Sequence, residues 1–201
     1  MNALLPSLLS ARLTRRAGAA LGALLLAAAA AHAQTAAAAP RVKLGTSAGD
    51  IVIELNRAKA PKTVDNFLQY VRDKQYDGTV FHRVIDGFMI QGGGFTADMK
   101  EKPTRAPVAF ETTGLTNDRG TIAMARTSNP NSASAQFFIN VKDNAMLNPP
   151  SPDGYGYVVF GKVVSGMDTV DKIRTVATGN KGMFQNVPLT PVVVQSATVL
   201  P

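Results

Sequence analysis

The feature that most constrains the fold of this chain is a succession of short apolar runs, each interrupted by glycine, proline or asparagine. Runs of this length, rich in β-branched and aromatic residues, are typical of strands. They predict strands over residues 42–46, 51–55, 79–85, 88–91, 121–125, 136–140, 157–164 and 192–200. Two segments, 61–71 and 167–176, have helical spacing instead. The sequence therefore predicts a mainly β domain with two helices, either a barrel or a sandwich.

The N-terminus is typical of a secretory signal peptide. Residues 1–33 contain Arg12, Arg15 and Arg16, then an apolar segment over 17–31 and a small-x-small site over 31–33. A membrane span needs about 20 strongly apolar residues, and this alanine-rich segment is shorter. We therefore expect cleavage after Ala33 and export, with no stable membrane association afterwards. The adjacent arginines leave the general and twin-arginine routes both open. A tether over 34–40 and one domain over 41–201 should follow.

Composition argues against several kinds of chemistry. The chain has no cysteine, so it can form neither a disulfide nor a thiolate site. After signal cleavage His82 is the one histidine, which argues against a zinc site. The one Gly-x-Ser-x-Gly match, residues 45–49, joins two predicted strands and does not lead from a strand into a helix, so no nucleophile elbow accompanies His82. The run 92–94 lacks the continuation of a phosphate loop, and we interpret it as a turn. We expect no metal and no cofactor.

Charge and periodicity limit the partners. The net charge is +7, but residues 1–33 hold three basic residues and no acidic one, which leaves +4 on the rest. These remaining charges are scattered along the chain, so they indicate neither a nucleic-acid interface nor an anionic membrane surface. No coiled-coil heptads occur, and we expect a monomer.

Several motifs appear in a fixed order along residues 41–201. They are the segments 61–67, 81–85, 87–93, 136–139 and 159–163, which read PKTVDNF, FHRVI, GFMIQGG, QFFI and VFGKV. In this order they resemble the cyclophilin family of peptidyl-prolyl cis-trans isomerases, and the exported bacterial members most of all. The resemblance implies an eight-stranded antiparallel barrel capped by two helices, an active site in a shallow outer groove, and a periplasmic location.

The resemblance also implies roles for particular residues. Arg83 matches the catalytic arginine. Phe88, Met89, Phe138 and Leu147 match the apolar pocket for the proline ring, Gln91 and Gln136 match polar residues that hold the substrate backbone or the arginine, and Ala125 matches a groove residue that precedes a backbone contact at Arg126.

Three rim positions depart from the best-known eukaryotic pattern. Met146 stands where many members have tryptophan, Arg126 where asparagine is common, and Tyr157 where a histidine lies at the pocket edge. The loop 148–156, with three prolines, is also longer. These departures affect the rim of the groove and argue against immunosuppressant binding. They leave the motif around Arg83 intact.

These residue types suit a reaction that breaks no covalent bond. Rotation about an X-Pro bond costs about 20 kcal/mol, because the twisted amide loses its resonance. A fixed guanidinium can donate to the proline nitrogen only when twisting has restored its lone pair, which stabilises the transition state selectively. Taken alone, Arg83 would be read as a surface charge and the apolar residues as core.

We therefore predict a prolyl isomerase that acts on unfolded or newly exported proteins containing X-Pro bonds. The alternative is a chaperone of the cell envelope that uses the same groove to hold proline-containing segments without essential turnover. Retention of Arg83 favours the enzyme, because a binding module would not need a transition-state donor.

Overall fold

The computed structural model describes residues 39–150 and 153–201, and the predicted signal peptide and most of the tether lie outside this part. In chain order the elements are β1 Arg41–Thr46, β2 Gly49–Leu55, α2 Pro61–Arg72, β3 Thr79–Ile85, β4 Met89–Thr96, β5 Thr121–Met124, β6 Phe137–Asn140, the 3-10 turn Ala145–Leu147, β7 Val159–Ser165, α3 Met167–Arg174, β8 Thr178–Lys181, β9 Phe184–Pro188 and β10 Val194–Leu200. No helix in this described part is long and apolar enough to cross a membrane.

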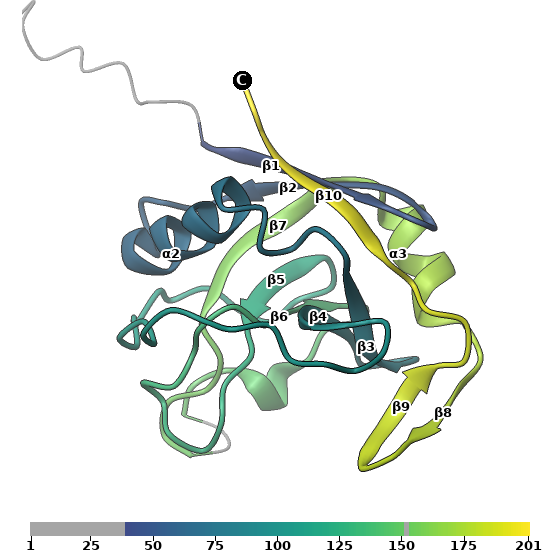
Figure 1. Cartoon of the computed structure of the whole chain (residues 1–201). Coiled ribbons are helices and arrows are strands. Elements are labelled where there is room, and N and C mark those ends of the chain that lie inside the picture. Colours follow the sequence, from purple (N-terminus) through teal and green to yellow (C-terminus); the bar gives the residue numbers. More distant parts are fainter. Residues whose placement is uncertain (1–38, 151–152) are drawn as a thin grey trace, which may run out of the picture. The chain divides into compact units, whose positions relative to one another are not determined.

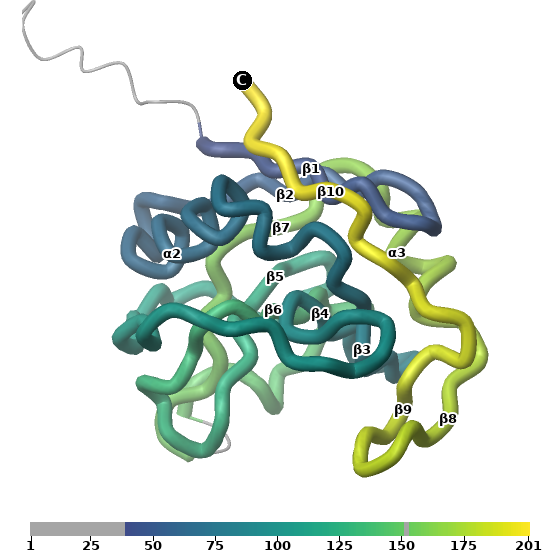
Figure 2. Tube along the Cα trace, viewed as in Figure 1, coloured from purple at the N-terminus to yellow at the C-terminus, as the bar shows by residue number. Residues whose placement is uncertain are grey.

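Eight of the strands form one antiparallel sheet in the order β10-β1-β2-β7-β5-β6-β4-β3. The two ends of this order approach each other, because Gly78 donates to the carbonyl of Val194 and Phe81 donates to that of Val192. The sheet thereby curls into a barrel, with α2 at one side and α3 at another (Figures 1 and 2). The predicted mainly β fold, with eight antiparallel strands and two helices, is confirmed, and the choice between barrel and sandwich is settled.

The interior of the barrel is filled by side chains. Phe67 of α2 packs against Phe160 at 5.2 Å and against Tyr76 at 5.1 Å between ring centroids. Phe137 meets Phe67 and Tyr76 edge-on, at 5.7 and 5.5 Å. These four rings are fully buried, and edge-to-face pairs of this kind add to the stability gained from burial alone. A polypeptide substrate therefore has to bind on the outside of the barrel.

Helix α2 begins without a capping side chain of its own, since its N-cap residue is Ala60. The distant Glu111 takes this place. Its carboxylate accepts hydrogen bonds from the backbone amides of Lys62 and Thr63, at 2.9 and 2.7 Å, and from the Thr63 hydroxyl at 2.6 Å. A carboxylate at a helix N-terminus satisfies free amides and also interacts favourably with the helix dipole. Glu111 thus ties a long loop to the helix that closes the barrel.

Glu111→Gln should lower the free energy of unfolding by about 1 kcal/mol, the usual magnitude for a lost N-terminal cap. Urea denaturation followed by circular dichroism measures this difference. The matched control is Glu101→Gln, which changes an exposed glutamate away from any helix end. Equal stabilities of the two variants would show that the cap contributes nothing.

Two local features differ from the sequence prediction. The glycines 92–94, interpreted as a turn, lie within β4, and only Gly93 has a positive φ, of 87°. Their small size makes room for neighbours, because a Cβ on Gly94 would lie 2.7 Å from the Gln136 side chain. The hairpin β8–β9 was not predicted at all. Its strands, TGNK and FQNVP, are mostly polar and lack the β-rich apolar run by which strands are recognised.

Candidate active site

The pairing of three strands places the predicted catalytic and pocket residues in one row. Arg83 of β3 lies opposite Gln91 of β4, and Gln91 lies opposite Phe138 of β6. The row continues through Ala123 of β5 to Val159 of β7. Because side chains alternate between the two faces of a sheet, these residues share the outer face of the barrel.

The neighbouring row of residues on the same three strands points into the core of the barrel. Val84, Ile90 and Ile139 are paired with one another across the same three strands, and all three belong to the main core. The outer face carries a separate apolar cluster formed by Met89, Ala123, Phe138, Leu147 and Val159. The barrel wall therefore has two apolar sides, and the outer one is available for a ligand.

A hollow with a volume of 130 Å³ lies over this outer cluster. The residues that line it are Arg83, Phe88, Met89, Gln91, Ala125, Arg126, Phe138, Leu147 and Tyr157. All of these were predicted site residues. Gln136 adjoins the hollow through Gln91. Met146 is 55% exposed and is not among the described residues that line the hollow.

A short relay of hydrogen bonds orients the polar groups of the hollow. The amide nitrogen of Gln91 donates to the Gln136 side-chain oxygen at 3.0 Å. This bond turns the oxygen of Gln91 toward Arg83, whose Nη1 lies 3.5 Å from it. The long second distance makes this a weak contact, so the Arg83 guanidinium keeps donors for a further acceptor.

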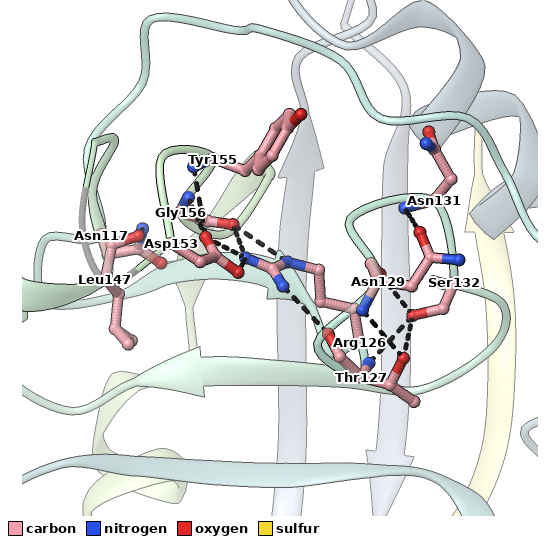
Figure 3. Close-up of polar contacts among 10 residues, drawn as sticks. All are labelled: Asn117, Arg126, Thr127, Asn129, Asn131, Ser132, Leu147, Asp153, Tyr155 and Gly156. Atoms are coloured by element: carbon pink, nitrogen blue, oxygen red, sulfur yellow. Dashed lines mark hydrogen bonds and ion pairs between the residues drawn. The ribbon is translucent and has the colours of Figure 1, made fainter.

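The Arg126 side chain is held by an ion pair and by hydrogen bonds to neighbouring groups of the protein (Figure 3). Its side chain is only 3% exposed and pairs with the carboxylate of Asp153. It also donates to the carbonyl oxygens of Gly156, at 2.7 and 3.1 Å, and of Thr127, at 2.9 Å. The guanidinium lies 4.7 Å from the centre of the Tyr157 ring. Burial, the largest single effect, would raise the pKa of Asp153, but the hydrogen bonds from Arg126, Tyr155 and Gly156 and the charge of Arg126 together outweigh it, and the pKa is lowered.

The sequence analysis therefore selected Arg126 as a rim residue without identifying what its side chain contacts. Tyr157, which it covers, meets Phe138 edge-on at 5.6 Å. Arg126 thus fixes the wall of the hollow that is formed by residues 153–157. Buried arginine with several acceptors is suited to such a structural role, because its planar donors fix the geometry of their partners.

Three buried asparagines, which the sequence did not single out, support the backbone of Leu147, Tyr157 and Phe88 around the hollow. Asn117 donates to the carbonyl of Leu147 at 3.2 Å, and Asn144 donates to that of Phe88 at 2.8 Å. Asn140 links them, donating to the Asn117 oxygen and accepting from Asn144. All three are fully buried. The sequence predicts Asn140 only as the end of the strand 136–140, and no local pattern marks the three asparagines as parts of a buried network.

His82 precedes Arg83 and lies under a neighbouring part of the surface. It is 5% exposed, and its ring packs against Phe95 at 4.7 Å. Burial lowers its pKa from 6.5 to about 4, against the effect of a backbone hydrogen bond with Val80, and the charge of Arg83 lowers it further. His82 is therefore neutral at physiological pH and adds no second positive charge beside Arg83.

The lowered pKa makes stability depend on pH. Below about pH 6.5 the unfolded chain takes up a proton on this imidazole, whereas the folded chain does so only near pH 4. The stability contributed by neutral His82 is thus present above pH 6.5 and is lost as the pH falls toward 4. Its slope is at most about 1.4 kcal/mol per pH unit.

The variant His82→Gln removes this titration while keeping a polar side chain. The free energy of unfolding of the wild type minus that of His82→Gln should therefore decrease between pH 7 and pH 4.5, because the carboxylates that titrate in this range are common to both. Urea denaturation at several pH values measures the difference. A difference that stays constant with pH would contradict the lowered pKa.

Comparison with known proteins identifies the class. Residues 41–199 match the family model described as cyclophilin type peptidyl-prolyl cis-trans isomerase, and the chain belongs to this family. It is 62% identical over 162 residues to a peptidyl-prolyl cis-trans isomerase of Streptomyces antibioticus, covering 79% of this chain and 98% of that protein. It is 57% identical over 161 residues to peptidyl-prolyl cis-trans isomerase B of Escherichia coli, covering 79% and 98%. The chain is a cyclophilin-type peptidyl-prolyl cis-trans isomerase.

Solved structures agree with the fold. A cyclophilin type isomerase of Cryptosporidium parvum is 27% identical and superimposes with a TM-score of 0.67, covering 81% of this chain and 98% of that one. A second structure of the same protein, in the presence of the dipeptide Ala-Pro, has a TM-score of 0.66 and covers 80% and 99%. The curled sheet with its two helices therefore belongs to the family architecture.

Proposed function

We propose that Arg83 is the catalytic residue of this isomerase, that the hollow beside it binds the proline ring, and that its clients are newly exported proteins. The observation that carries the first two parts is the row Arg83, Gln91 and Phe138 on the outer face of the barrel. It places a cation, an oriented amide and an aromatic ring side by side. A Cryptosporidium parvum relative was crystallised with Ala-Pro, which supports a proline-containing ligand here.

The apolar side of the hollow holds the proline ring. Phe138 is 4%, Met89 2% and Leu147 9% exposed, so these side chains are held by packing before a ligand arrives. A pocket that is already ordered loses little conformational entropy on binding. With the ring fixed in the pocket, rotation about the X-Pro bond moves the preceding residue and its carbonyl, while the proline nitrogen stays beside Arg83.

The polar side of the hollow acts on the twisted bond. In the planar amide the proline nitrogen has no available lone pair, so Arg83 gains little from it. In the twisted state the nitrogen becomes an acceptor, and a charged donor at the edge of an apolar pocket stabilises it strongly. Gln91, oriented by Gln136, holds the guanidinium through the 3.5 Å contact without occupying its donors fully. The reaction needs no proton transfer and no covalent intermediate.

Arg83→Ala should fold normally and lose roughly 10²-fold or more in kcat/KM, a magnitude taken from the loss of one transition-state donor. Arg83→Lys should recover little, since a lysine ammonium lacks the planar donors of arginine. Exchange NMR on a short X-Pro peptide measures both. Val199→Ala, which shortens an exposed side chain of β10, is the control and should retain the activity. Wild-type rates in a folded Arg83→Ala protein would remove Arg83 from this role.

The proposed export rests on residues 1–33, with their arginines, apolar segment and small-x-small site. In a bacterial host, the full chain should be recovered from the periplasmic fraction with Gln34 as its first residue. N-terminal sequencing of the recovered protein tests this expectation. Replacing Ala31 and Ala33 by leucine should prevent processing, because small residues are required at the cleavage site. Recovery of the unprocessed wild-type chain from the cytoplasm would contradict export.

A further inference from the structure

A second hollow lies directly beside the one that we assign to proline. Its volume is 440 Å³, which falls within the range of about 300–1,000 Å³ that is usual for ligand pockets. Arg83 and Gln136 line one side of it, and Met183, Phe184, Gln185 and Asn186 line the other. The second group comes from the hairpin β8–β9, which the sequence patterns did not predict.

The hairpin is fixed to the barrel at the base of this hollow. Phe184 packs edge-on against Phe95 at 5.1 Å, and Phe95 packs in the same way against His82 at 4.7 Å. This aromatic stack joins β9 to β4 and β3. Lys181 donates to the carbonyl of Ala97 at 2.8 Å and ties down the other strand. The hairpin projects from the barrel beyond β3, on the side away from the C-terminus (Figure 1).

Met183, at the turn of this hairpin, is exposed to an unusual degree. It is 89% exposed, more than any other large hydrophobic side chain of the described residues. A single exposed methionine has little meaning by itself. Here it stands at the edge of a hollow, and methionine is an adaptable residue at surfaces that bind varied apolar side chains.

The two hollows adjoin each other at Arg83. Arg83 lines both of them. Gln136 lines the second and accepts the hydrogen bond of Gln91, which lines the first. An extended polypeptide advances about 3.3 Å per residue, so a client whose proline occupies the first hollow reaches the second within a few residues. No additional partner is needed to occupy it.

We infer that the hairpin β8–β9 forms a second subsite, which binds an apolar side chain located within a few residues of the proline in the same client. The chemistry of the lining selects this class of side chain. Phe95, Phe184 and Met183 offer apolar contact, the amides of Gln185 and Asn186 can bind peptide groups, and none of the described lining residues is acidic. This inference rests on the proposed function, because it requires the proline to occupy the hollow beside Arg83.

The test uses two peptides for each position from three residues before the X-Pro pair to three after it. One peptide has leucine at that position and the other has serine, with serine at all other flanking positions. At one or two positions on one side of the proline, the wild type should show a kcat/KM about 3- to 10-fold higher for leucine, a modest value for a side chain that is only partly buried. In Met183→Ser this ratio should fall to about one.

Leu189→Ser is the matched control. Leu189 is 69% exposed, follows the same hairpin and lines a different hollow, on the other side of it. It should leave the leucine-to-serine ratio unchanged. A second readout is the NMR signal of the Met183 methyl group, which should shift on addition of the preferred leucine peptide and not of its serine counterpart.

Failure of this inference is distinguishable from failure of the proposed function. If the wild type catalyses all the peptides with no leucine preference, or if the preference survives in Met183→Ser, the second subsite is wrong. If the wild type catalyses none of them, the proposed function is wrong, and an unshifted Met183 signal would then overturn the subsite as well.

Discussion

The register of β3, β4 and β6 is the constraint on which the rest of this molecule depends. It places Arg83, Gln91 and Phe138 in one row and points them outward. The neighbouring row points into the core. A shift of one residue in any of these strands would exchange the two faces, placing a guanidinium in an apolar interior and removing the pocket from the surface. Burial of the inner row therefore fixes the proposed active site as a consequence of folding.

Because side chains fill the interior of the barrel, a substrate can bind only at its outer wall. The rings of Phe67, Tyr76, Phe137 and Phe160 occupy the space that a larger barrel would offer to a ligand. A substrate that is itself a long polypeptide could not enter a closed barrel. On the outer wall it can lie across the strands, with only its proline ring buried. The outer apolar cluster provides this burial without opening the core.

The sequence predicted most of this wall and less of what surrounds it. Strands such as β1, β2 and β3 were predicted from short β-rich runs between turn residues, and the row that contains Arg83 from the motifs in β3, β4 and β6. The asparagine network around Asn140 was not predicted, because most of its hydrogen bonds join segments 23 to 56 residues apart in the chain. The Arg126 contacts were missed for the same reason. The hairpin β8–β9 was missed because its stability comes from packing Phe184 against Phe95 and not from alternation.

The sheet residues that the sequence predicted and the loop contacts that it did not predict have different proposed roles. Chemistry that breaks no bond needs one donor held in place, and a rigid sheet holds it best. Selection among clients needs contacts that can vary, and the parts available for this lie in connections: the loop that Arg126 fixes and the hairpin that carries Met183. Loops positioned by a rigid scaffold commonly carry specificity. Sequence patterns predict a structure well where backbone pairing of strands determines it. They predict it poorly where contacts between individual side chains determine it. The residues by which this isomerase would differ from its relatives are therefore the ones that local sequence patterns reveal least.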